Sequence, residues 1–160
     1  MTKEQMAFVE KVGWVFEHSP WVAERASSGL PFPNPKAMHV AMVEVVRHAT
    51  PAEQLALIQA HPDLGARAKM SDASVGEQAG AGLHQLMHEE FDTLNRLNSD
   101  YKSKFGFPFI YAVKGNTKQD VLMALETRLG NTQEAEHATA LEQIFRIAWF
   151  RLSDIFKESA

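Results

Sequence analysis

The sequence contains no cysteine, no apolar run of membrane-spanning length and no excess of positive charge. Without cysteine, the chain can form no thiol nucleophile, thiolate metal site, iron–sulfur cluster or disulfide scaffold. No apolar run approaches the ~20 residues that a membrane-spanning helix needs. The 16 basic and 20 acidic residues give a net charge of -4, which argues against non-specific nucleic-acid binding. The charges at Lys3, Glu4 and Glu10 do not fit a signal peptide, so we expect a cytoplasmic protein whose chemistry uses histidine, carboxylates, arginine, hydroxyls and the backbone.

Strand patterns are almost absent, and helical patterns run through nearly the whole chain. Apolar residues recur at helical spacing from the first segment onward, as at Phe8, Val12 and Val15. A length of 160 residues suits one domain with a single core. The sequence therefore predicts an all-α fold, a compact single-domain bundle of about seven or eight helices over residues 1–160. We expect these helices at about 3–17, 20–29, 37–48, 51–60, 74–91, 94–104, 118–129 and 134–156.

Prolines and capping residues mark several helix boundaries. Ser19-Pro20 and Thr50-Pro51 each place a capping hydroxyl before a proline at the first helical position. Thr117 is expected to cap the helix that follows it. The run 31–35 contains three prolines, which exclude a helix interior and predict a loop.

One segment departs from the helical pattern. Residues 105–113 are apolar and aromatic, and we expect them to be extended and buried. The simplest interpretation is a hydrophobic strap that closes the core. However, an extended segment in a helical protein has backbone N–H and C=O groups that must find partners, and a flat heterocycle with urea-like groups could supply them.

His61 differs from the other six histidines in its local context. Pro62 disfavours helical geometry at His61, so the preceding helix should end at about Ala60 and the imidazole should point in a fixed direction. A helix C-terminus favours the imidazolium, and a nearby carboxylate adds to that effect. Such a histidine suits general acid–base catalysis, while simple capping of the helix end explains it equally well.

Two other features also allow a structural and a functional interpretation. Ser74 and Glu77 have the spacing of a capping box, but the glycines at 76, 80 and 82 could instead leave backbone amides open to an anionic or amide-rich ligand. Arg128 and Arg151 lie on predicted helices with apolar neighbours, so each is a weak candidate for a carboxylate clamp. Most helical arginines instead pair with a local carboxylate, as Asp154 offers to Arg151.

His84 and His88 lie one helical turn apart and raise the question of a metal site. Residue 85 is glutamine, where the HExxH zinc motif requires glutamate. Because a histidine pair on an amphipathic helix is more often a solvated face, we expect no metal site. A metal-dependent helical hydrolase using His84 and His88 stays an alternative, as does a non-catalytic helical protein-interaction module.

Taken in order, these features resemble the 2-oxo-4-hydroxy-4-carboxy-5-ureidoimidazoline (OHCU) decarboxylase family of uric acid breakdown. Any one motif is weak, but the ordered set is specific and covers about residues 8–156. The matching segments are Glu17-His18-Ser19-Pro20-Trp21, Ala60-His61-Pro62-Asp63-Leu64-Gly65, Ser74-x-x-Glu77-Gln78, Ala81-Gly82-Leu83, Asn98-x-x-Tyr101, Phe105-Gly106-Phe107-Pro108-Phe109-Ile110, Arg128-Leu129-Gly130-Asn131 and Arg151-Leu152-Ser153-Asp154.

The resemblance implies an all-helical, cofactor-free enzyme, usually a homodimer, which converts OHCU into (S)-allantoin and carbon dioxide. It implies His61 as the catalytic acid/base and Glu77 as its acidic partner, and a substrate contact by Arg128 or Arg151, without deciding between them. It also implies functional coupling to a hydroxyisourate hydrolase, since OHCU is the product of 5-hydroxyisourate hydrolysis. The implied substrate-lining residues are Pro62, Ser74, Val75, Gly76, Gln78, Phe109, Ile110, Tyr111, Ala112 and Val113.

This reaction suits a protein without thiols. When the carboxylate leaves, the neighbouring ring C=N can take up the electron pair, so neither a metal nor pyridoxal is required as an electron sink. We hypothesise that His61 and Glu77 move protons at the substrate hydroxyl and ring. One of them then protonates a single face of the planar intermediate and gives a single enantiomer.

Overall fold

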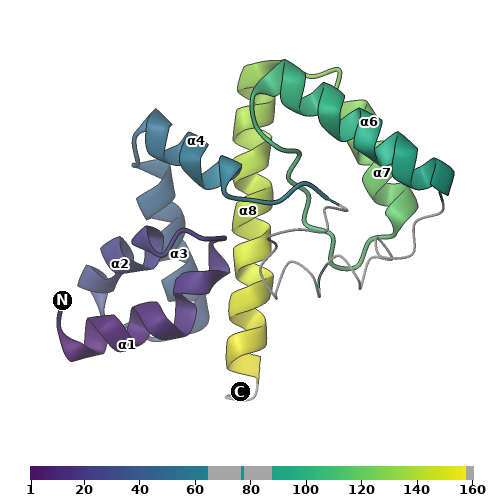
Figure 1. The fold of residues 1–160 in the computed structure, drawn as a ribbon. Helices are drawn as coiled ribbons and strands as arrows, with labels where there is room; N and C mark the ends of the chain where they lie inside the picture. Colours follow the sequence, from purple (N-terminus) through teal and green to yellow (C-terminus); the bar gives the residue numbers. More distant parts are fainter. Residues whose placement is uncertain (65–76, 78–87, 158–160) are drawn as a thin grey trace. The chain divides into compact units, whose positions relative to one another are not determined.

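The structure, a computed structural model, describes residues 1–64, 77 and 88–157, and these residues form a helical protein (Figure 1). Within the described residues there are seven α-helices, two short 3-10 helices and no strand. The all-α prediction is therefore confirmed. Contacts divide the chain into two compact units, residues 1–60 with 144–160, and residues 61–143. A single domain over residues 1–160 stays a prediction. None of the described helices is both long enough and apolar enough to cross a membrane.

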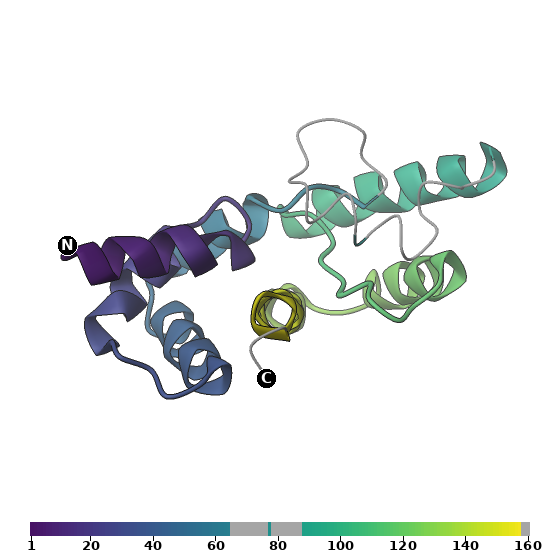
Figure 2. The same cartoon turned by 90° about the horizontal axis from the view of Figure 1, so that it is seen from below.

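The first unit is built from short helices around an apolar core. Helices α1, α2 and α3 pack together (Figure 2), and the second half of α8 belongs to the same unit. The elements are α1 (Lys3–Val12), η1 (Gly13–Val15), α2 (Trp21–Ala26), η2 (Ser27–Gly29), α3 (Pro35–Arg47), α4 (Pro51–Gln59) and α8 (Gln133–Phe156). The most deeply buried apolar side chains are Val12, Val15, Phe16, Val22, Ala23, Met42, Val46, Leu57, Ile58, Ile144, Ala148 and Leu152.

The predicted boundaries of α4 are confirmed. Thr50 Oγ1 accepts the amide of Glu53 at 3.1 Å, and the Glu53 carboxylate accepts the amide of Thr50 at 3.0 Å. This reciprocal capping box, followed by Pro51, starts the helix. The helix ends at Gln59 with Ala60 as its C-cap, as Pro62 predicts.

Three other boundary predictions in this unit are wrong. Helix α3 begins at Pro35 because Asn34 accepts the amide of Ala37 at 2.8 Å, which leaves Pro35 at the first helical position, where its missing N–H costs nothing. Ser19 does not cap α2 with its side chain, since its hydroxyl donates to the Glu17 carbonyl at 2.9 Å. The first helix passes into a 3-10 turn at Gly13, a residue with low helix propensity, and does not continue to residue 17.

The second unit contains α6 (His88–Phe105), α7 (Lys118–Arg128) and the first part of α8. Helices α6 and α7 run alongside each other (Figures 1 and 2). The predicted break near residues 91–94 is wrong, because this stretch contains neither glycine nor proline and α6 runs through it. Gly106 ends α6 with a φ of 80°, and its amide donates to the Lys102 carbonyl at 2.8 Å. Thr117 caps α7 with its side chain, as predicted.

The segment that follows α6, residues 106–113, contains neither helix nor strand and is largely buried; the burial is what its composition predicts, and we call it the extended segment. Its phenylalanines pack around Tyr101 of α6, with ring centroids 4.5 Å from Phe105, 6.0 Å from Phe107 and 5.4 Å from Phe109. Tyr101, Phe105 and Phe109 are each at most 2% exposed. The aromatic residues therefore form the centre of this unit's core and hold the extended backbone against α6.

Candidate active site

His61 lies two residues beyond the end of α4 and opens the second unit. It is only 8% exposed, which is uncommon for a histidine at a helix end. Pro62 follows directly and restricts the backbone at His61. The helix thus ends before His61, as predicted, and a directed imidazole stays a prediction.

Two side chains of α6 hold the residues that follow His61. The amide group of Asn98 donates to the Leu64 carbonyl at 3.0 Å, and Asn98 is 5% exposed. One turn further along α6, the ammonium of Lys102 lies 3.3 Å from the carboxylate of Asp63. The segment His61 to Leu64 is therefore anchored to α6 at two points. Sequence reasoning missed Lys102 altogether and included Asn98 only as part of a motif.

The extended segment finds hydrogen-bond partners for several backbone groups among the protein's own side chains. Gln133 donates to the Phe105 carbonyl at 3.3 Å, and Arg128 donates to the Ile110 carbonyl at 2.6 Å. The Ala112 amide donates to Gln143 at 2.9 Å. Gln133 and Gln143 lie in the part of α8 that belongs to this unit, so the segment is fixed by bonds from α7 and α8 as well as by its aromatic packing.

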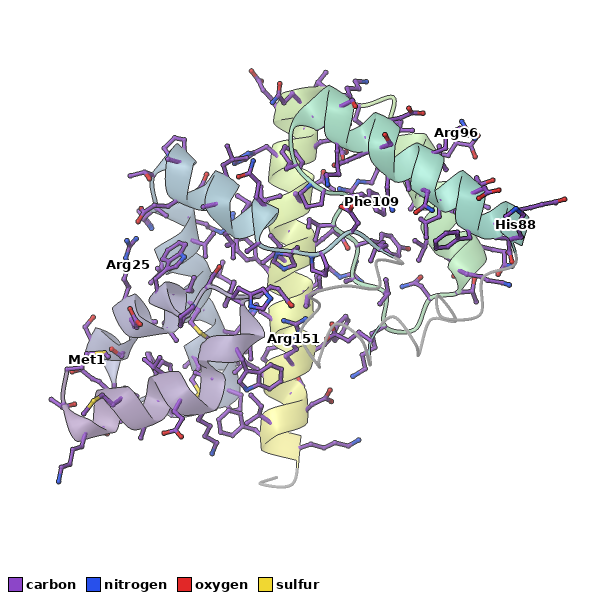
Figure 3. The ribbon with its side chains drawn as sticks, viewed as in Figure 1. Met1, Arg25, His88, Arg96, Phe109 and Arg151 are labelled. Carbon is purple, nitrogen blue, oxygen red and sulfur yellow. The ribbon has the colours of Figure 1, made fainter. Side chains whose placement is uncertain are left out.

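Arg128 occupies the interior of the second unit. Its Nε donates to Glu136 Oε1 at 2.8 Å, its Nη1 to the Ile110 carbonyl at 2.6 Å, and its Nη2 lies 3.5 Å from the Tyr101 hydroxyl. The guanidinium carbon also lies 4.5 Å from the centre of the Phe109 ring. Figure 3 shows Phe109 on the extended segment beside α6. Each nitrogen of this guanidinium therefore has a partner within the protein.

Glu136 receives hydrogen bonds on both carboxylate oxygens. Oε1 accepts from Arg128 and from the Tyr101 hydroxyl at 2.5 Å, and Oε2 accepts from Asn131 at 2.8 Å. Glu136 and Tyr101 are 0% exposed. Burial, reinforced by the hydrogen bond to the Glu136 carboxylate, raises the pKa of Tyr101 well above its usual 10. The phenol therefore stays protonated and acts as a donor to Glu136.

Arg151 belongs to the first unit and is 3% exposed (Figure 3). Its Nη2 donates to the Glu17 carboxylate at 2.8 Å, and its Nη1 lies 3.3 Å from the Val15 carbonyl and 3.4 Å from the Trp14 carbonyl. Glu17 is 1% exposed, so the two residues form a buried ion pair. The two arginine candidates thus lie in different units, each beside a buried glutamate.

The structure locates only part of the remaining predicted site. Glu77 is helical and half-buried. Pro62 is half-buried, and Tyr111 is more exposed than Phe109, Ile110, Ala112 and Val113, which are buried. The predicted substrate-lining residues Ser74, Val75, Gly76 and Gln78, and the metal candidate His84, lie outside the described residues.

The metal alternative gains no support from the described residues. His88 is the first residue of α6 (Figure 3). Its Nε2 lies 3.3 Å from Asp92 Oδ2, and both side chains are exposed. Within residues 1–64, 77 and 88–157, no cluster of three or more His, Asp and Glu could hold a metal ion. The cofactor-free expectation stays a prediction.

Comparison with known proteins decides the family. Residues 2–153 match the family described as OHCU decarboxylase. The chain belongs to the OHCU decarboxylase family. The 2-oxo-4-hydroxy-4-carboxy-5-ureidoimidazoline decarboxylase of Haloferax volcanii is 43% identical over 150 residues, which are 94% of this chain and 89% of that protein. The uric acid degradation bifunctional protein of Bacillus sp. (strain TB-90) is 46% identical over 151 residues, but this chain spans only 30% of its length.

Solved structures of related proteins have the same fold. A crystal structure of (S)-allantoin synthase matches 96% of this chain with a TM-score of 0.79 and 32% identity, and the match covers 50% of that chain. A crystal structure of OHCU decarboxylase in the presence of (S)-allantoin matches 86% of this chain and 91% of that one, with a TM-score of 0.73. Its sequence identity of 24% shows the fold alone. The helical fold is thus shared with OHCU decarboxylases.

Proposed function

We propose that this protein is a carboxy-lyase that converts OHCU into (S)-allantoin and carbon dioxide in uric acid degradation. The observation that carries the proposal is a nearly buried histidine, His61, on a segment that α6 anchors at Asp63 and Leu64. A general acid or base needs this kind of fixed position, because proton transfer depends on geometry before it depends on pKa. Membership of the OHCU decarboxylase family supplies the substrate and the reaction.

The reaction needs one bond cleavage and a transfer of protons. The bond between the hydroxyl-bearing ring carbon and the carboxylate breaks, and carbon dioxide leaves. The electron pair of that bond forms a double bond to the adjacent ring carbon, whose C=N nitrogen takes up the displaced pair and a proton. The enol oxygen then loses its proton as the ureido-bearing carbon gains one, which gives allantoin.

We assign these proton transfers to His61 and Glu77. His61 is the general acid/base and Glu77 its acidic partner, and together they move the protons at the hydroxyl and at the ring. Protonation of the ureido-bearing carbon from one face gives the S enantiomer. A positioned acid/base of this kind contributes about 10²–10⁴-fold to the rate. Pro62, Ser74, Val75, Gly76, Gln78 and the backbone of 109–113 line the substrate in this proposal.

We propose that one of the two buried arginines, Arg128 or Arg151, contacts the substrate. All three guanidinium nitrogens of Arg128 already bind protein groups, so a carboxylate clamp at Arg128 would require this arrangement to break. Arg151 likewise binds Glu17 and lies close to the Val15 and Trp14 carbonyls, so a clamp at Arg151 would also have to replace protein partners.

The test adds the purified protein to freshly generated OHCU and follows the circular dichroism of (S)-allantoin, because spontaneous decay gives a racemate. We expect His61→Asn to lose at least about 100-fold in turnover with little change in thermal stability. His88→Asn is the matched control and should keep normal turnover after treatment with a chelator. Near-normal turnover of His61→Asn would contradict the assignment, and loss of turnover in His88→Asn or with the chelator would favour the metal-dependent alternative.

We also propose that the protein works as a homodimer in the cytoplasm, without a cofactor, and in functional coupling to a hydroxyisourate hydrolase. A Bacillus relative is named as a bifunctional protein of uric acid degradation and is about three times the length that this chain matches, which supports coupling to a further activity of uric acid degradation without identifying it. Light scattering on the protein as it elutes from a size-exclusion column tests the homodimer. A mass of about 18 kDa for the eluted species, the mass of one chain, would contradict it.

A further inference from the structure

Four polar side chains lie together in the core of the second unit, next to the backbone of the extended segment. We call Tyr101, Arg128, Asn131 and Glu136 the Arg128 cluster. They come from α6, from α7, from the turn after α7 and from α8. We propose that the Arg128 cluster positions the Ile110 carbonyl, and with it the substrate-lining backbone of residues 110–113. This inference rests on the proposed function, because the lining role of that backbone is part of it.

The hydrogen bonds of the cluster leave Arg128 a single orientation. Glu136 accepts from Nε at 2.8 Å and, through its other oxygen, from Asn131 at 2.8 Å. The Tyr101 hydroxyl donates to Glu136 and lies 3.5 Å from Nη2. Nη1 is thereby aimed at the Ile110 carbonyl, 2.6 Å away. Because a guanidinium is a rigid planar fork, fixing two of its nitrogens fixes the direction of the third.

The energetics of buried ion pairs argue for positioning over stability as the main role of the cluster. Moving a guanidinium and a carboxylate out of water costs several kcal/mol per ion, and apolar residues of similar volume are often neutral or stabilising in such places. Here Arg128 and Glu136 are 8% and 0% exposed, yet every one of their polar nitrogen and oxygen atoms has a partner. Apolar residues in place of Arg128 and Glu136 could not form the hydrogen bond to the Ile110 carbonyl, 18 residues away along the chain. This bond is therefore the reason we give for the charged pair.

The contacts on either side of Ile110 also restrain the backbone of the segment. Phe109 lies under the Arg128 guanidinium at 4.5 Å, and the Ala112 amide donates to Gln143 at 2.9 Å. The backbone is thus held immediately before, at and after the Ile110 carbonyl. A segment without helix or sheet hydrogen bonds needs such side-chain bonds to keep one conformation.

Helix α6 connects the cluster with the His61 segment. Tyr101 lies one turn after Asn98, which donates to the Leu64 carbonyl, and residues three apart share one helical face. The same face of α6 therefore bonds the acid/base segment directly and the lining segment through Glu136 and Arg128. This arrangement fixes the position of the proposed acid/base relative to the proposed substrate-lining backbone.

The test replaces the ion pair by apolar side chains in the double variant Arg128→Met/Glu136→Met. We expect a folded protein whose kcat on OHCU falls at least about tenfold, since a displacement near 1 Å can cost about 100-fold. We also expect hydrogen exchange of the Ala112 amide to become at least about tenfold faster relative to amides of α6. Arg128→Lys should show the same loss of kcat, because an ammonium keeps the charge but not the fork.

Val121→Ala is the matched control. Val121 is fully buried in α7 two turns before Arg128, so this variant loses stability without losing a hydrogen bond to the extended segment. We expect its kcat within about twofold of the wild type. If the double variant is not folded, Tyr101→Phe replaces it, because this change removes only the hydroxyl that donates to Glu136 and lies 3.5 Å from Arg128 Nη2.

Three outcomes distinguish a failure of the positioning role from a failure of the proposed function. A folded variant, either the double variant or Tyr101→Phe, with kcat within twofold of the wild type and unchanged exchange at Ala112 would overturn the positioning role. An equal loss of kcat in Val121→Ala would also overturn it, because general destabilisation would then explain the effect. Absence of turnover in the wild type would refute the proposed function, and the exchange rate at Ala112 would still decide whether the cluster holds the segment.

Discussion

The buried pair of Arg151 and Glu17 allows a quantitative prediction for the first unit. Replacing Arg151 by methionine keeps most of the side-chain volume but removes the guanidinium, which donates to Glu17 at 2.8 Å. The Glu17 carboxylate then stays in a site where it is 1% exposed, without its main counter-charge. His18 lies 3.8 Å from the same carboxylate, but its side chain is 57% exposed and offers only weak compensation.

Breaking a buried ion pair by removing one partner costs about 3–5 kcal/mol, because an uncompensated charge is left behind. We expect Arg151→Met to lose this amount of unfolding free energy, with only a small addition from the long bonds to the Val15 and Trp14 carbonyls. The double variant Glu17→Gln/Arg151→Met should regain most of the loss, since no buried charge remains.

Urea unfolding at pH 7, followed by tryptophan fluorescence, measures these free energies by linear extrapolation. A loss below about 1 kcal/mol in Arg151→Met would refute the reasoning, because it would mean that the Glu17 carboxylate is solvated or paired elsewhere. A double variant as unstable as the single one would also refute it, since packing would then account for the effect.

The remaining predictions concern pH, the core and the His61 segment. The hydrogen bond from Arg25 lowers the pKa of Glu53 from 4.5 to about 2, so the stability that this pair contributes is present above about pH 4.5 and is lost as the pH falls towards 2. In urea unfolding, the difference in unfolding free energy between wild type and Glu53→Gln should shrink over that pH range. A constant difference would contradict this prediction. Met42 is 0% exposed, so Met42→Ala should cost about 2–5 kcal/mol in the same assay, and a cost below 1 kcal/mol would mean that the site collapses around the cavity. Asn98→Ala should cost about 1–3 kcal/mol by leaving the Leu64 carbonyl unpaired, and should lower kcat on OHCU; a normal kcat would show that this anchor does not position the catalytic segment.

Local signals in the sequence predicted the helix starts correctly at Thr50 and Thr117, but not at Ser19 or Asn34. Thr50 and Thr117 each form the expected cap, and α4 ends ahead of Pro62. These boundaries depend on atoms within three or four residues along the chain, so a linear pattern contains the whole interaction. Prediction failed at Pro35, where three prolines suggested a loop and the neighbouring Asn34 in fact starts a helix.

The sequence by itself determined the all-α class, the extended apolar segment and the unusual context of His61, because each depends on local composition and backbone restriction. It also carried the ordered motifs by which the family could be recognised. It could not determine what the two arginines do. A local rule offers Asp154 to Arg151, but the structure pairs Arg151 with Glu17, 134 residues away. Arg128 binds Glu136 on another helix and Ile110 on the extended segment, 18 residues away. Such pairs form only when tertiary packing removes water from both groups and brings them together, since the desolvated charge then requires a partner wherever the fold supplies one.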